Sequence, residues 1–199
     1  MELKAFARIL SAGLQKPTTH TLKMSDGQAP EKVLKRELIE KQVERVWEDY
    51  PGLLVCTPPW SDKRSPIRRL CAWHLKQAHV QGTLVKIGCE DCWSDSKEWA
   101  SVDAWGMRHN FDIVVRDRSR TEALVIEVKA FKGAGSPNGE VQRFIGQLLL
   151  ARSKHPIVMG ICGRWTTANM GLFKDTAKVD KVCRQLDLEM VFLEIREAQ

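Results

Sequence analysis

The sequence predicts an α/β domain with a mixed central β-sheet flanked by α-helices. From residue 33 onward, the patterns run in the order helix, strands, helix, strand, helix, strand, which is typical of this class. Two β-rich runs on either side of the polar turn "RDRSRTE" predict a hairpin over residues 111–129. The chain has 199 residues, of which 43% are apolar and 28% charged, which is enough for one domain with a sizeable core.

Residues 1–30 are predicted to form an N-terminal arm that precedes the main domain at 31–199. Residues 1–15 favour a short amphipathic helix, and the stretch "QKPTTHTLKMSDGQAP" that follows favours a linker or an irregular arm. The apolar stripe of this helix consists of Leu3, Phe6, Leu10 and Leu14.

The clearest helix spans residues 31–50 and ends at Pro51 and Gly52. Glu40 lies on the flank of its apolar stripe, and Glu37 and Glu44 lie further round. The stripe consists of Ile39, Val43, Val46, Trp47 and Tyr50.

The middle of the chain is the least regular part. "LLVCTPPW" predicts a short strand that ends at two prolines. Residues 60–100 predict an irregular insertion rich in cysteine and tryptophan, within which "IRRLCAWHLKQAH" favours a helix and "GTLVKIG" a strand.

The remaining elements follow the hairpin. A glycine-rich loop, "FKGAGSPNG", precedes a helix at "EVQRFIGQLLLARS". "IVMGICG" predicts an apolar strand, "TAKVDKVCRQL" a helix and "LEMVFLEI" a last strand.

The predicted hairpin carries the residues that are candidates for catalysis. Asp112 lies near the start of its first strand, and Glu127 and Lys129 lie near the end of its second. Because antiparallel strands place such positions opposite one another, we expect the three side chains to converge. Glu127 and Lys129 share one strand face, which we expect to look away from the core.

Two carboxylates and a lysine in this arrangement suit the hydrolysis of a phosphodiester. Carboxylate oxygens are ligands that Mg²⁺ prefers, and a bound metal activates water and stabilises charge on a phosphate. A lysine beside the metal can orient that water or assist its deprotonation. The structural alternative is a solvated surface pair that contributes less than about 1 kcal/mol.

The segments "FDIVV", "VIEVKAF" and "GQLLLA" resemble the PD-(D/E)XK phosphodiesterases, which include restriction-type and repair nucleases. The resemblance covers roughly residues 33–165 and implies a restriction-endonuclease-like core, namely a helix, a three-strand meander, a helix and a further strand. Asp112 and Glu127 match the metal ligands of the family, and Lys129 matches its catalytic lysine. The backbone carbonyl of Val128 is a further candidate ligand for Mg²⁺ or Mn²⁺.

Two further roles in this family have competing candidates here. A glutamate on the first helix often supports the metal site, and Glu40 is preferred over Glu37 because it flanks the packed stripe. A glutamine often lies on the helix after the lysine, where Gln147 competes with Gln142. These glutamines are about 140° apart around a helix and cannot share one role.

The cysteines suggest a separate structural zinc site. Cys71 and His74 are followed by Cys89 and Cys92, which are two short-spaced ligand pairs separated by a loop. His79 is an alternative to His74. The remaining cysteines, Cys56, Cys162 and Cys183, lie in apolar runs and are predicted to be core residues.

The net charge of +6 and the positions of several basic residues suit a nucleic-acid partner. Lys132, Arg68, Arg69 and Arg116 are the candidates for contacts with phosphate groups.

We therefore expect a Mg²⁺-dependent endo- or exodeoxyribonuclease, with a possible second copy or protein partner for targeting. DNA is favoured over RNA because the superfamily acts mostly on DNA. The alternative is a catalytically inactive nucleic-acid-binding or assembly module of the same fold. Glu2, Lys4 and Arg8 argue against a signal peptide, and no long apolar run exists, so we expect a cytoplasmic protein that has no membrane partner.

Overall fold

The computed structural model of the protein describes residues 2–25, 27–57, 64–67, 101–104, 107–116, 123–133, 138–167 and 176–198. Nearly all of the insertion predicted at 60–100 lies outside these residues. In chain order the elements are α1 (Glu2–Gln15), β1 (His20–Leu22), α2 (Pro30–Leu34), the π-helical segment η1 (Lys35–Ile39), α3 (Glu40–Trp47), β2 (Leu54–Cys56), β3 (Ser101–Ala104), β4 (Met107–Asn110), β5 (Ile113–Arg116), β6 (Ala123–Phe131), α7 (Asn138–Lys154), β7 (Ile157–Trp165), α8 (Thr176–Gln185) and β8 (Leu188–Glu197).

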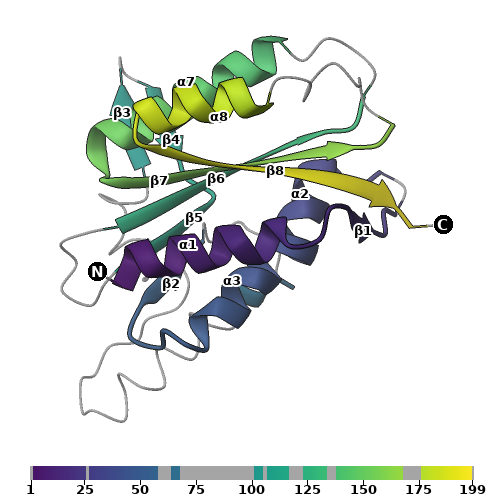
Figure 1. Ribbon diagram of the computed structural model, residues 1–199, viewed down its shortest axis with the longest axis horizontal. Coiled ribbons are helices and arrows are strands. Elements are labelled where there is room, and N and C mark those ends of the chain that lie inside the picture. Colours follow the sequence, from purple (N-terminus) through teal and green to yellow (C-terminus); the bar gives the residue numbers. More distant parts are fainter. Residues whose placement is uncertain are drawn as a thin grey trace.

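A six-stranded mixed sheet crosses the molecule in the order β1-β8-β7-β6-β5-β2 (Figure 1). Strands β2, β5 and β6 are antiparallel neighbours, whereas β6, β7, β8 and β1 run parallel to one another. Helices α1, α2 and α3 lie on one face of the sheet, and α7 and α8 lie on the other. The predicted α/β class is therefore confirmed. A separate antiparallel pair, β3 and β4, precedes β5.

The N-terminal segment belongs to both the core and the sheet. The predicted apolar stripe of α1 is fully buried, from Leu3 to Leu14. The stretch after it, for which the sequence predicts a linker or an irregular arm, contains β1, which pairs with Ile195–Glu197 at the other end of the chain. A strand of three residues is too short to show a periodic pattern, so only its distant partner reveals it.

Helix α2, η1 and helix α3 form one helical run from Pro30 to Trp47 with a π-turn in its middle. The amide of Glu40 bonds to the carbonyl of Lys35, five residues earlier. Leu34 and Ile39 would lie about 140° apart in a regular α-helix. The wider π-turn brings both into the same core, where each is fully buried.

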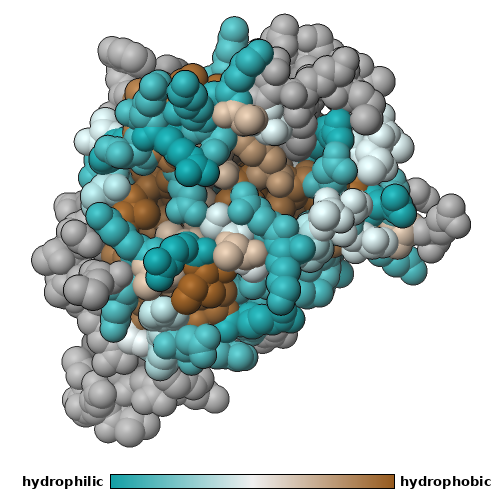
Figure 2. Space-filling view, viewed as in Figure 1, coloured by the Kyte–Doolittle hydropathy of each residue, from teal (hydrophilic) through white to brown (hydrophobic). Residues whose placement is uncertain are grey.

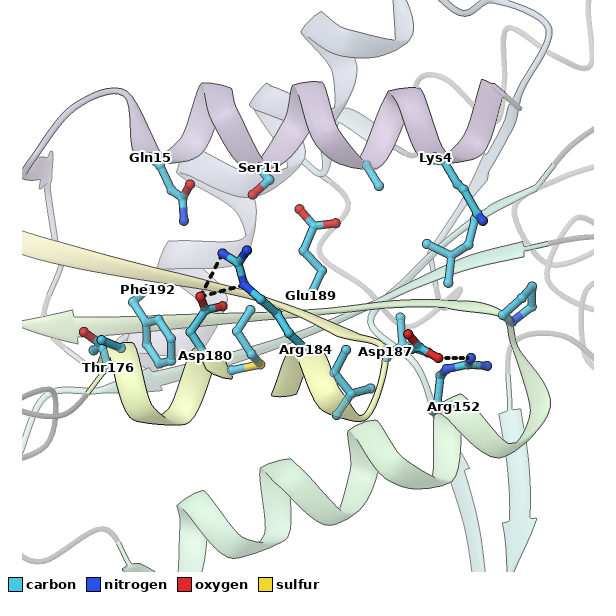
Figure 3. Close-up of a pocket in the computed structure, with 17 residues that line it drawn as sticks. Lys4, Ser11, Gln15, Arg152, Thr176, Asp180, Arg184, Asp187, Glu189 and Phe192 are labelled. Carbon is cyan, nitrogen blue, oxygen red and sulfur yellow. Dashed lines mark hydrogen bonds and ion pairs between the residues drawn. The ribbon is translucent and has the colours of Figure 1, made fainter. Parts of the chain in front are cut away.

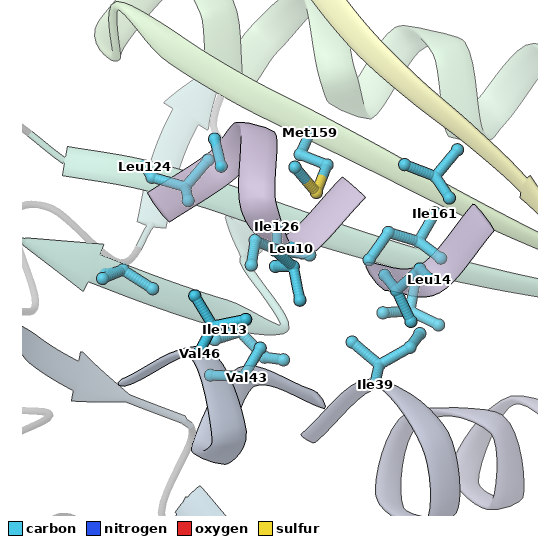
Figure 4. Packing of buried hydrophobic residues seen from close by; sticks show 14 of the residues in the cluster. Leu10, Leu14, Ile39, Val43, Val46, Ile113, Leu124, Ile126, Met159 and Ile161 are labelled. Carbon is cyan, nitrogen blue, oxygen red and sulfur yellow. The ribbon is translucent and has the colours of Figure 1, made fainter. Parts of the chain in front are cut away.

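The sheet has a hydrophobic core on each face. Leu124, Ile126 and Val128 of β6 pack with α1 and α3 in the first core (Figure 4). Val125 and Phe131 belong to the second core, which contains residues of α7 and α8. The expectation that the Glu127 face of β6 looks away from the core is therefore wrong, because α7 covers it.

In the described part of the chain, no helix is long and apolar enough to cross a membrane.

A glycine lets α7 pack closely on the sheet. A Cβ atom added at Gly160 of β7 would lie 2.7 Å from the Leu148 Cδ1 atom of α7 and 2.7 Å from the Met190 sulfur. Gly160 pairs in register with Glu127, so this close approach also determines how deeply Glu127 is covered.

We predict that Gly160→Ala lowers the free energy of unfolding by about 1–3 kcal/mol, because the added methyl group overpacks this contact. Gly146→Ala is the matched control, since nothing lies within 4 Å of a Cβ atom added at this position of α7. It should raise the free energy of unfolding by up to about 1 kcal/mol through helix propensity. Urea denaturation measures both changes, and equal effects would contradict the packing argument.

Candidate active site

The side chains of Asp112 and Glu127 meet where β5 begins. Ile113 pairs with Ile126, so the preceding residue, Asp112, comes opposite Glu127. The two carboxyl groups share a hydrogen bond. The structure therefore brings together the two acidic residues of the hairpin in the way that the predicted register requires.

Asp112 also connects three separate parts of the chain. Its Oδ2 accepts a hydrogen bond from the Val128 amide at 3.0 Å, and its Oδ1 lies 3.0 Å from the Lys35 ammonium. The Thr57 hydroxyl donates to the Asp112 carbonyl oxygen at 3.1 Å. Because β5 begins only at Ile113, its backbone ladder does not reach Val128, and the Asp112 carboxylate accepts the hydrogen bond of the Val128 amide instead.

Glu127 is buried, with 4% of its surface exposed. Burial raises the pKa of its carboxyl group well above the usual range, and the charge of Asp112 and the hydrogen bond to it raise the pKa further. The positive charge of Lys35 opposes this rise. Protonation of Glu127 would relieve the repulsion between the two close carboxyl groups.

Lys129 lies between carboxylates from two helices. Its ammonium is 3.3 Å from the carboxylate of Glu31 on α2 and 3.8 Å from that of Glu140 on α7. Burial raises the pKa of Glu31, Lys129 lowers it, and the charge of Asp112 raises it again. Glu31 is therefore electrostatically coupled to both Lys129 and Asp112.

The helix carboxylate at this site is Glu31, which the sequence analysis did not identify. Glu37 instead pairs with Arg36 and Lys41, at 2.6 and 2.7 Å, and Glu40 is buried, with 2% of its surface exposed. Glu40 was predicted from a regular α-helix with an apolar stripe that begins at Ile39. The spacing of Glu31 and Lys35, one helical turn apart, is the signal that could have revealed them.

The two candidate glutamines lie on different sides of α7. Gln147 is half-buried and lies on the same helical stripe as Glu140, seven positions earlier, and Phe144, whose side chain is buried. Gln142 is exposed. The helix geometry therefore favours Gln147 as the glutamine that faces the site.

Two predicted nucleic-acid contacts lie within the described residues. Arg116 is 2% exposed, so the expectation that it contacts nucleic acid requires correction, since its position in β5 carries it into the protein. Lys132 forms an ion pair with Glu197 at 2.8 Å.

The other predicted sites fall largely on residues that the structure does not describe. Cys56, Cys162 and Cys183 are buried free thiols, as predicted, and burial raises the pKa of Cys162. Among the described residues, no group of three or more His, Cys, Asp or Glu side chains could hold a metal ion. The proposed zinc ligands Cys71, His74, Cys89 and Cys92, the alternative His79, and Arg68 and Arg69 lie outside the described residues.

The donor set at Asp112 and Glu127 fits a hard divalent cation. Two carboxyl groups lie close enough to share a hydrogen bond, and a cation would stabilise both in the ionised form. Mg²⁺ keeps several water ligands in proteins, so one or two carboxylates are sufficient.

Comparisons with known proteins show little similarity. No sequence family matches the chain, and no curated protein matches it significantly. One similar solved structure is an XisH family protein from Nostoc punctiforme, at 16% identity over 46% of this chain and 72% of that chain. Another is an fdxN element excision controlling factor protein from Anabaena variabilis, at 15% identity over 46% and 71%. The TM-score is 0.29 for both.

We predict that the stability of the metal-free protein falls as the pH rises through the folded-state pKa of Glu127. The raised pKa means that folding stabilises the protonated carboxyl group, and this contribution is complete only below the ordinary value of 4.5. Each pH unit between the two values costs about 1.4 kcal/mol.

Glu127→Gln mimics the protonated form and should flatten this part of the pH profile. Urea denaturation in chelator-treated buffer at a series of pH values measures the difference. Parallel profiles for the wild type and Glu127→Gln would contradict the assignment.

Proposed function

We propose that the chain is a PD-(D/E)XK-type nuclease that hydrolyses DNA phosphodiester bonds with Mg²⁺ or Mn²⁺. The observation that carries this proposal is the contact between the Asp112 and Glu127 carboxyl groups, with Lys129 two residues further along the same strand face. The antiparallel strands β2, β5 and β6, followed by α7 and β7, support a restriction-endonuclease-like core.

Each side chain has a role that follows from its contacts. Asp112 and Glu127, with the Val128 carbonyl, would hold the cation, which when bound lowers the pKa of a water and stabilises charge on the phosphate. The Lys129 ammonium orients the attacking water and assists the loss of its proton. Glu31 and Glu140 keep that ammonium in position, since each lies within 4 Å of it.

Lys35 contributes positive charge beside Asp112. Its ammonium lies 3.0 Å from the Asp112 carboxylate and offsets the negative charge of that side chain. Binding of a cation would favour the ionised form of Glu127 and would compete with Lys35 for one oxygen of Asp112.

The alternative is a catalytically inactive nucleic-acid-binding or assembly module. The Lys35–Asp112 ion pair is the observation that favours it, because the ammonium engages an oxygen that a metal would need. The two proposals differ in one measurable respect, which is whether the purified protein cleaves nucleic acid when Mg²⁺ is added.

We predict that the protein cleaves DNA in the presence of Mg²⁺ and that Lys129→Ala reduces the rate by about 10²–10⁴-fold, since it removes the group that assists the nucleophile. The assay uses linear, nicked and single-stranded DNA, with RNA for comparison. Lys41→Ala is the matched control, because Lys41 is a lysine of α3 that pairs with Glu37 and has no role in the proposed site. Cleavage that persists unchanged in Lys129→Ala would exclude the catalytic role, and no cleavage of any substrate would favour the inactive module.

We predict that Glu31→Gln reduces the rate by about 10–100-fold, because loss of a partner that orients an active-site group usually has an effect of this size. Glu37→Gln should leave the rate unchanged, since Glu37 pairs with Arg36 and Lys41 instead. Thermal unfolding of both variants separates loss of activity from loss of folding. An equal effect of the two substitutions would contradict the assignment of Glu31.

A further inference from the structure

One edge of the sheet has an unpaired stretch of strand. β1 pairs with β8 only at Ile195–Glu197. Among the described residues, no strand pairs with the outer edge of Leu188–Glu194, so backbone groups of alternate residues there lack a ladder partner on that side. This edge lies two strands away from β6, which carries Glu127 and Lys129.

The unpaired stretch borders a groove between α1 and α8, with a volume of about 890 Å³ (Figure 3). Side chains of α1 and α8 form its two walls, and the first half of β8 forms its floor. The volume is in the usual range for a ligand site, about 300–1,000 Å³. The wall residues include Lys4, Ser11 and Gln15 of α1, and Thr176, Asp180 and Arg184 of α8.

Two charged groups in the groove have no ion-pair partner among the described residues. Arg184 pairs with Asp180 at 2.8 Å, and Arg152 pairs with Asp187 at 3.1 Å. Glu189, on the floor, interacts with the charge of Arg184 without forming an ion pair, and Lys4, on the wall formed by α1, has no ion pair within the described part of the chain either. An occupant with a basic group opposite Glu189 and an acidic group near Lys4 would complement both charges.

The position of the β8 edge between two helices limits which partners can pair with it. α1 and α8 lie on opposite faces of the sheet, and their side chains flank the edge of β8 on both sides. In a second copy, the same edge lies between the same two helices, which disfavours direct pairing of two such edges. In the space-filling view, hydrophobic residues are visible across this face between hydrophilic ones (Figure 2). A single extended segment can enter the groove.

We propose that this groove binds an extended segment of a partner protein, which adds to β8 as a further strand along Leu188–Glu194. A segment of about seven residues matches the length of the open edge. Main-chain hydrogen bonds to β8 provide the affinity. Specificity comes from a basic side chain that pairs with Glu189 and an acidic side chain that approaches Lys4.

The test begins with a phage-displayed library of random dodecapeptides selected on the immobilised full chain. Enriched peptides are synthesised with a fluorophore, and binding is measured by anisotropy. Hydrogen exchange should slow at backbone amides within Leu188–Glu194 when the peptide is bound. We expect the enriched peptides to share a basic residue within an extended, proline-free core.

Two variants locate the binding site. Ala177→Trp fills the groove from an exposed position on α8 and should abolish binding, whereas Val182→Trp, at an exposed position outside the groove lining, should not change it. Glu189→Lys should weaken binding by about tenfold, which equals about 1.4 kcal/mol. A peptide whose basic residue is replaced by glutamate should recover affinity for Glu189→Lys.

Several results would overturn the proposal. The first is the absence of any enriched peptide, and the second is equal binding to Ala177→Trp and the wild type. The third is hydrogen exchange that slows only at backbone amides outside β8. Sedimentation equilibrium tests the competing occupant, because a dimer of the wild type that Ala177→Trp dissociates would assign the edge to a second copy. None of these readouts depends on nuclease activity.

Discussion

The arrangement of the candidate site depends on the carboxylate of Asp112, which lies at the point where β5 stops pairing with β6. One oxygen accepts the Val128 amide and the other contacts the Lys35 ammonium. The carboxylate thereby completes the hydrogen bonding of β6 and joins the hairpin to the helical run that begins at Pro30. The Asp112 side chain also contacts Glu127, and its charge adds to the effect of burial in raising the pKa of that carboxyl group.

Helices on both faces of the sheet supply the other charged side chains around Asp112 and Glu127. The π-turn allows one helical run to bury both Leu34 and Ile39, while Glu31 on α2 and Lys35 at the start of η1 reach the active-site residues. On the other face, the absence of a side chain at Gly160 lets α7 approach closely. Lys129 consequently lies between a carboxylate from α2 and one from α7.

The two proposed activities use different parts of the same sheet. The acidic pair and Lys129 lie on β5 and β6, where one strand ends before its neighbour. The groove lies along β8, where β1 pairs with only the last part of the strand. In both places a short strand leaves part of a longer one unpaired. The Asp112 side chain occupies the first place, whereas the second is open to an added strand.

The sequence by itself determined the elements that have long, regular patterns, together with the positions of the acidic pair and the lysine on the hairpin. Long elements could be predicted because each repeats its hydrophobic pattern several times, as in the stripe of α1, the hairpin, α7, β7, α8 and β8. β1 and the π-turn could not be read in this way, because three residues or one wide turn carry no period.

Only the tertiary structure decided which groups surround that pair. Glu31 and Lys35 come from a helical run far before Glu127 in the chain and Glu140 from the helix that follows β6, so their approach depends on how these helices pack on the sheet. The burial of Arg116 and of the Glu127 face has the same origin. The alternating pattern of a strand specifies toward which face of the sheet a side chain points. The helices that pack on that face determine which groups the side chain contacts.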